Sequence, residues 1–158
     1  MSFRFVRSAG STHEPAVVLM PGSGVIHPGG VVVIDQANNL VSPATSSSTT
    51  TMIFGVSQDY IQGNSDAFVR VIPFVQGQLW EADCANAITT ANILKLHQLA
   101  TDTVLRNITN PTTVNLGETG GVGIFLAYAV TGLATGSGKL LGSFVQRTPF
   151  RNDGFTVV

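Results

Sequence analysis

The residues that could do chemistry in this chain are few, and their spacing assembles no catalytic or metal-binding motif. Cys84 is the only cysteine, and His97 is the histidine nearest to it in the sequence. Without a local signature, such a pair is weak evidence for a nucleophile and its base, because a lone cysteine more often behaves as a small buried hydrophobe. His13, His27 and His97 lack metal-ligand spacing, and no second cysteine completes a zinc site. We expect no enzyme activity, no metal and no cofactor.

Two segments imitate nucleotide-binding motifs. Residues 132–139 are glycine-rich and end in a lysine, but Leu140 stands where a phosphate-binding loop needs Ser or Thr to hold magnesium. We interpret this segment as the connection of a β-hairpin. Residues 55–63 resemble the uracil-pocket segment of trimeric dUTP pyrophosphatases, with Gln58 where that family has an aspartate. We interpret them as the end of a strand followed by a turn.

One pair of carboxylates has a spacing that chemistry could use. If residues 78–84 form a strand, Glu81 and Asp83 share one face of it. Two carboxylates on one face could bind a cation or act as acid and base. A solvated strand end explains them equally simply, and we favour that interpretation.

The elements that must position these residues are mostly strands. Runs of β-branched or alternating apolar residues lie between turns that contain glycine, proline or asparagine, and they predict strands at 31–34, 40–41, 52–56, 67–74, 123–130 and 140–145. In 67–74, Phe68, Ile72 and Phe74 share a face with Arg70, and Val69 and Val71 point the other way. Pro73 predicts that this strand ends, or lies at an edge, near that point.

The segment 123–130 is apolar on both faces, one formed by Ile124, Leu126, Tyr128 and Val130 and the other by Phe125, Ala127 and Ala129. We expect both faces to be covered, and a second copy of the chain could supply one cover. The only helix candidate is 83–91, where Asp83 could act as the N-cap, with at most one or two turns. The sequence therefore predicts an all-β fold, a sandwich or small β-barrel with at most one short helix.

Composition limits the possible partners. Charged residues make up 11% of the 158 residues, whereas about 25% is usual in soluble domains. The net charge is −1, so no overall field attracts nucleic acid or an anionic membrane. The longest weakly polar stretch, 120–134, is shorter than the roughly 20 apolar residues of a membrane-spanning helix. A surface this poor in charge suits protein–protein contacts, and we expect a homo-oligomer.

Both ends of the chain interleave aromatic and basic residues. The candidate protein-interface residues are Phe3, Arg4, Phe5 and Arg7 at one end and Arg147, Phe150, Arg151 and Phe155 at the other. Aromatic residues and arginine anchor interfaces, but these phenylalanines could equally fill the core of this chain, and both interpretations stay open. We expect residues 1–12 to form an N-terminal arm, 13–147 a β-barrel domain and 148–158 a C-terminal segment.

Part of the sequence resembles a known family. The succession GVVVID (30–35), LVSPA (40–44) and IFGVS (53–57) is similar to the barrel core of tailed-bacteriophage head decoration (capsid cement) proteins. Three later segments resemble small phage virion proteins: VRVIPF (69–74), GQLWEAD (77–83) and LLGSF (140–144). The resemblance implies a compact β-domain, a small β-barrel or β-tulip-like sandwich. It also implies a structural virion protein, made in the host cytoplasm, that binds the major capsid protein on the capsid surface as a homotrimer. The alternatives are another virion component, in the tail or in head completion, and a carbohydrate-binding β-module that uses Trp80 or Tyr60.

Overall fold

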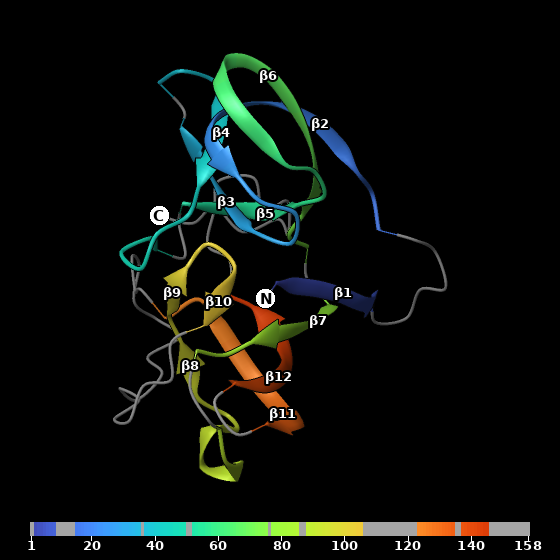
Figure 1. Cartoon of the computed structure of the whole chain (residues 1–158). Coiled ribbons are helices and arrows are strands. Elements are labelled where there is room, and N and C mark those ends of the chain that lie inside the picture. Colours follow the sequence, from blue (N-terminus) through green and yellow to red (C-terminus); the bar gives the residue numbers. More distant parts are fainter. Residues whose placement is uncertain are drawn as a thin grey trace, which may run out of the picture.

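The structure is a computed structural model, and it describes residues 2–8, 15–35, 37–49, 52–75, 77–85, 88–105, 123–134 and 137–145. Within these residues the regular structure is β-strand apart from one short 3-10 turn, so the predicted all-β class is confirmed. The strands form a closed barrel, a five-stranded sheet and a two-stranded ribbon (Figure 1).

The barrel closes in the order β2-β4-β3-β5-β6 and lies at the top of Figure 1. Its strands are β2 (Val18–Ile26), β3 (Val31–Asp35), β4 (Leu40–Pro43), β5 (Ile53–Ser57) and β6 (Ile61–Pro73). The strands predicted at 31–34, 40–41, 52–56 and 67–74 are therefore confirmed, and β6 ends at Pro73 as expected. Closure removes the open edges that a small sheet would otherwise expose.

The alternation predicted for β6 also holds. Val69 and Val71 are fully buried in the barrel interior. Ile72 is buried in a second core outside the barrel, whereas Phe68 and Arg70 point to solvent. The wall of the barrel thus separates two cores and leaves part of β6 facing outward.

The five-stranded sheet has the order β1-β7-β12-β11-β8 and is antiparallel throughout. Its strands are β1 (Phe3–Ser8), β7 (Gln78–Asp83), β8 (Leu96–His97), β11 (Phe125–Ala134) and β12 (Ser137–Phe144). The ribbon beside it pairs β9 (Leu99–Thr101) with β10 (Val104–Leu105). The predicted hairpin is confirmed, but its strands extend until Ala134 pairs with Ser137, so most of the expected connection 131–139 is strand.

Two local predictions need correction. Asp83 ends β7 instead of capping a helix, and the only helical turn in the described part of this region is η1 (Thr90–Asn92), capped by Thr89. β-Branched threonines favour a short capped turn over an α-helix. In β11 the expected alternation breaks at a register shift between Ala127 and Ala129, which lets Val130 pack against the core.

The barrel and the sheet share one hydrophobic core. It combines barrel residues such as Val31 and Ile53 with sheet residues such as Trp80 and Phe125. Phe144 is partly buried and packs against this core, stacked on Phe74 with ring centroids 4.0 Å apart. Because each layer covers the other here, the residues of this shared core would not stay buried in either layer alone.

Candidate protein-interaction surface

The outer side of strands β2 and β6 exposes large apolar side chains. Leu19 lies opposite Arg70 and Pro21 opposite Phe68, and all four lie on the side of the ladder away from Val69 and Val71 in the barrel interior. Leu19 is 63% exposed and Phe68 is 60% exposed, and Val17, just before β2, is 51% exposed. We call Val17, Leu19, Phe68 and Arg70 the β2–β6 face. Exposed apolar residues gathered on one face are typical of a protein-contact site.

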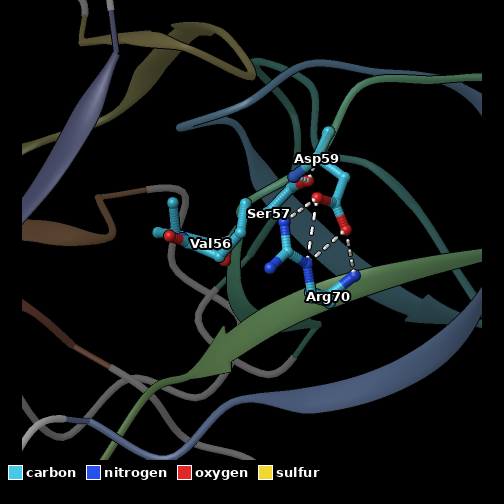
Figure 2. Close-up of polar contacts among 5 residues, drawn as sticks. Val56, Ser57, Asp59 and Arg70 are labelled. Atoms are coloured by element: carbon cyan, nitrogen blue, oxygen red, sulfur yellow. Dashed lines mark hydrogen bonds and ion pairs between the residues drawn. The ribbon is translucent and has the colours of Figure 1, made fainter.

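The charge on this face is balanced within the chain. The turn after β5 brings Asp59 against Arg70, and the two side chains face each other in Figure 2. The backbone N–H of Arg70 donates to Asp59 Oδ2 at 2.9 Å, and Nε of Arg70 lies 3.1 Å from both carboxylate oxygens. The hydrogen bond from Arg70 lowers the pKa of Asp59 below its ordinary value. A partner of this face therefore need not supply a counter-charge.

The conformation of this turn follows from Ser57. Its hydroxyl donates to the carbonyl oxygen of Asp59 at 2.8 Å, and the N–H of Asp59 donates to Ser57 Oγ at 3.2 Å. Ser57 is fully buried, so these bonds satisfy a polar group that burial would otherwise penalise. The prediction of a strand end followed by a turn at 55–63 is confirmed, since β5 ends at Ser57 and β6 begins at Ile61.

The N-terminal interface candidates divide between core and surface. Phe3 is 3% exposed and packs against Phe144, and Phe5 meets the ring of Trp80 edge-on at 5.4 Å. Both rings therefore serve the core of this chain, which was one of the two interpretations. Arg4 and Arg7 are exposed, and these residues belong to strand β1, paired with β7. The other candidates lie outside the described residues: Arg147, Phe150, Arg151 and Phe155.

Glu81 and Asp83 share one face, as predicted, and both are used in ion pairs across the sheet. Lys139 Nζ lies 3.0 Å from Asp83 and 3.7 Å from Glu81, and Arg4 bonds Glu81 at 3.0 Å. The hydrogen bond to Asp83 raises the pKa of Lys139. The backbone N–H of Ser2 also donates to Asp83 at 2.8 Å. These carboxylates link β1, β7 and β12, which fits a structural role.

The candidate nucleophile is held in the core. Cys84 is fully buried, and burial raises the pKa of its thiol to about 12, with a smaller effect from the charge of Asp83. His97 is also fully buried, and its Nε2 lies 3.0 Å from the carbonyl of Asn92. His27 lies at the surface, 3.2 Å from Asp102, and His13 lies outside the described residues. No group of three metal-ligating side chains gathers in the described part of the chain.

Trp80 cannot be the exposed aromatic residue of a carbohydrate site, because it is 1% exposed and packs in the shared core. That expectation is wrong for Trp80, whereas Tyr60 is 55% exposed. Sequence reasoning also missed Leu19, and it grouped Phe68 with Ile72, Phe74 and Arg70 on one face of the strand without assigning that face to the core or to solvent. The available signal was Arg70, which shares the face of Phe68 and marks it as facing solvent.

Comparisons with known proteins identify no family for this chain. No protein-family model matches the chain, and no curated protein sequence matches it. In the described part of the chain, no helix has the length and apolar character needed to cross a membrane.

Proposed function

We propose that this chain is a structural virion protein that decorates and cements the outer surface of an icosahedral tailed-phage capsid, acting as a homotrimer without catalysis. The observation that carries the proposal is the β2–β6 face, where Leu19 and Phe68 are more than half exposed on the wall of a closed barrel. A small barrel is also the architecture that the resemblance to head decoration proteins implies. The proposed partners are the major capsid protein and other copies of this chain.

The mechanism would be physical. Each β2–β6 face buries a few apolar side chains, at about 25 cal/mol for each Å² removed from water, so one contact alone is weak. Three linked copies would bind neighbouring capsid subunits together, and linkage multiplies weak contacts into avidity. Because the trimer would bind only the assembled shell, it would stabilise that shell by mass action.

The test mixes purified protein with emptied phage heads and measures occupancy by sedimentation and by imaging. Wild type should saturate the heads, and Phe68→Asn should need at least about tenfold more protein for the same occupancy. Val75→Asn is the matched control, because Val75 is 59% exposed and lies outside the β2–β6 face. Absence of wild-type binding, or equal binding by Phe68→Asn, would contradict the proposal. Occupancy in a ring at a tail or portal would favour another virion component.

A carbohydrate-binding module is the second candidate, and Tyr60 favours it. Its ring is 55% exposed and lies 5.8 Å from the ring of His27, so an aromatic and a polar group stand side by side. Sugars stack on exposed rings of this kind. Glycan-array binding that is lost in Tyr60→Ala but kept in Phe68→Asn would support this candidate over capsid decoration.

A further inference from the structure

Strand β6 continues beyond the strand that covers one of its two edges. The ladder between β5 and β6 runs from Gly55↔Pro73 to Ser57↔Val71, whereas β6 itself begins at Ile61. Within the described residues, β5 therefore leaves the edge of β6 before Val71 uncovered. An uncovered edge offers backbone hydrogen bonds to any extended chain that meets it, and it is a common origin of aggregation.

The first residue on this part of the edge is Arg70. Along a strand, the backbone groups of successive residues point to opposite edges. The N–H of Phe74 donates to the carbonyl of Phe54 at 2.8 Å, so Phe74 directs its backbone toward the β5 side. Arg70 lies four residues earlier and directs its N–H and its carbonyl oxygen to the same side. A strand added next to β5 would pair with these two groups.

The turn between β5 and β6 already occupies both groups. The N–H of Gln58 donates to the carbonyl oxygen of Arg70 at 2.8 Å. The N–H of Arg70 donates to Asp59 Oδ2 at 2.9 Å. The same carboxylate also binds the guanidinium, and the dashed lines in Figure 2 join Asp59 to Arg70 through these contacts. An incoming strand would have to displace the turn before it could pair at Arg70.

The edge is also short in the other direction along β6. The ladder with β2 changes register between Gly22↔Ala67 and Gly24↔Gly63. Such an irregularity interrupts the even spacing that a new strand needs. In the regular part of the strand between Ala67 and Arg70, alternation leaves the backbone groups of Phe68 facing this edge. With Arg70 closed, no run of consecutive pairing positions remains there.

Asp59 is held in its place by bonds that do not involve Arg70. The buried Ser57 hydroxyl donates to the carbonyl oxygen of Asp59, and it accepts the N–H of Asp59. The hydrogen bond from Arg70 lowers the pKa of Asp59, so the side chain is ionised at neutral pH. An ionised carboxylate is a stronger acceptor for a backbone N–H than a neutral oxygen.

We infer that Asp59 is a guard residue, which closes the edge of β6 against strand addition and leaves the β2–β6 face to make contacts through its side chains. The guard stands where it is needed, because Leu19 and Phe68 are exposed beside this edge and an apolar strand with an open edge pairs with the wrong chains. Blocking one mode of contact makes the remaining mode more specific. The inference concerns the free protein, so it goes beyond the proposed function and does not depend on it.

The test compares three variants by amide hydrogen exchange, measured by NMR, and by native mass spectrometry. Asp59→Ala removes both oxygens, Asp59→Asn keeps one oxygen that can accept the N–H of Arg70, and Arg70→Gln removes the guanidinium but keeps the backbone N–H. At low protein concentration, the amide of residue 70 should exchange at least about tenfold faster in Asp59→Ala than in wild type. Asp59→Asn and Arg70→Gln should stay close to wild type.

Self-association is the second measurement. Asp59→Ala should form species larger than the wild-type oligomer at concentrations at least about tenfold lower than wild type does. The amide of residue 70 should then become protected again as the concentration rises, because it pairs with another chain. Asp59→Asn and Arg70→Gln should form no such species in the same range, although both lose the ion pair.

Three results would overturn the inference. Equal exchange at residue 70 in wild type and Asp59→Ala would show that the carboxylate does not close the edge. Faster exchange without larger species would leave Asp59 a merely structural role. Equal self-association in all three variants would assign the effect to the lost ion pair. Phe68→Asn keeps the guard and should exchange like wild type at Arg70, so a failure in head binding alone concerns the proposed function.

Discussion

Replacing Phe74 with alanine tests whether the barrel and the sheet unfold as one unit. Phe74 follows β6 directly, so it is where the chain leaves the barrel, and it is 6% exposed. Its ring stacks on Phe144 at 4.0 Å and meets Trp80 edge-on at 5.8 Å. Truncating a buried phenylalanine costs about 3–5 kcal/mol through lost transfer energy and the cavity left behind. Because domains are stable by only about 5–15 kcal/mol, Phe74→Ala should remove a large share of the stability.

Trp80 is the only tryptophan, so its fluorescence reports on the shared core without a label. With a urea slope of about 2 kcal/mol/M, a loss near 4 kcal/mol shifts the unfolding midpoint by about 2 M. Fluorescence and far-UV circular dichroism should give the same midpoint in wild type, because one core joins both layers. Val75→Ala is the control: Val75 is 59% exposed, and its truncation should change stability by at most about 0.5 kcal/mol. A shift below about 0.5 M in Phe74→Ala, or two separate wild-type transitions, would refute the shared-core reasoning.

Three further predictions follow from single contacts. Gly55→Ala should lower the urea midpoint, because a Cβ at this position would collide with the backbone carbonyl of Ile72, whose carbon would lie 2.9 Å away. The free energy of unfolding should fall by about 1–3 kcal/mol. The hydrogen bond from Arg70 lowers the pKa of Asp59 in the folded state. The stability that this pair contributes is therefore fully present above the ordinary carboxylate pKa of 3.8, and it is lost as the pH falls through the lower pKa of Asp59 in the folded protein. The Tm difference between wild type and Asp59→Asn should accordingly be seen at pH 7 and close in acid, and a constant difference would contradict this. Cys84, with its thiol pKa raised to about 12, should react with Ellman's reagent at least about a hundredfold faster in denaturing urea than in buffer at pH 8.

Local patterns were sufficient for most of the barrel. The β-branched run of β3 and the alternation around Val69 and Val71 can be recognised from neighbouring residues alone, because side chains along a strand alternate with a period of two. Strand β2 was not predicted, since Pro21, Gly22 and Gly24 are breakers within it. The structure accommodates them with a register shift between Gly22 and Gly24, where Gly24 has φ of 81°. The register shift arises from pairing with β6, and β6 lies too far along the sequence for a short sequence pattern around β2 to include it.

The candidate site was harder to predict than the fold. Phe68 and Ile72 lie on one side of β6, yet Phe68 is exposed and Ile72 is buried, because the five-stranded sheet covers only one end of the barrel wall. Phe3 posed the opposite problem: its place near the chain terminus suggested an arm, whereas pairing with β7 draws it into the core. Whether an apolar residue is core or interface depends on contacts far apart in the sequence.

The last prediction concerns the effect of salt, because this chain has few charged side chains and pairs several of them with one another. Charged residues make up 11% of the sequence. The ion pairs Arg70–Asp59, Arg4–Glu81 and Lys139–Asp83 join side chains within one copy. Contacts made by the β2–β6 face would then be apolar and hydrogen-bonded, and salt screens neither kind of contact. Occupancy of heads and the mass of the oligomer should therefore change little between low salt and 1 M NaCl, where the Debye length is about 3 Å. If molar salt strips the protein from heads or separates its copies, charge carries these contacts and the β2–β6 face is misassigned.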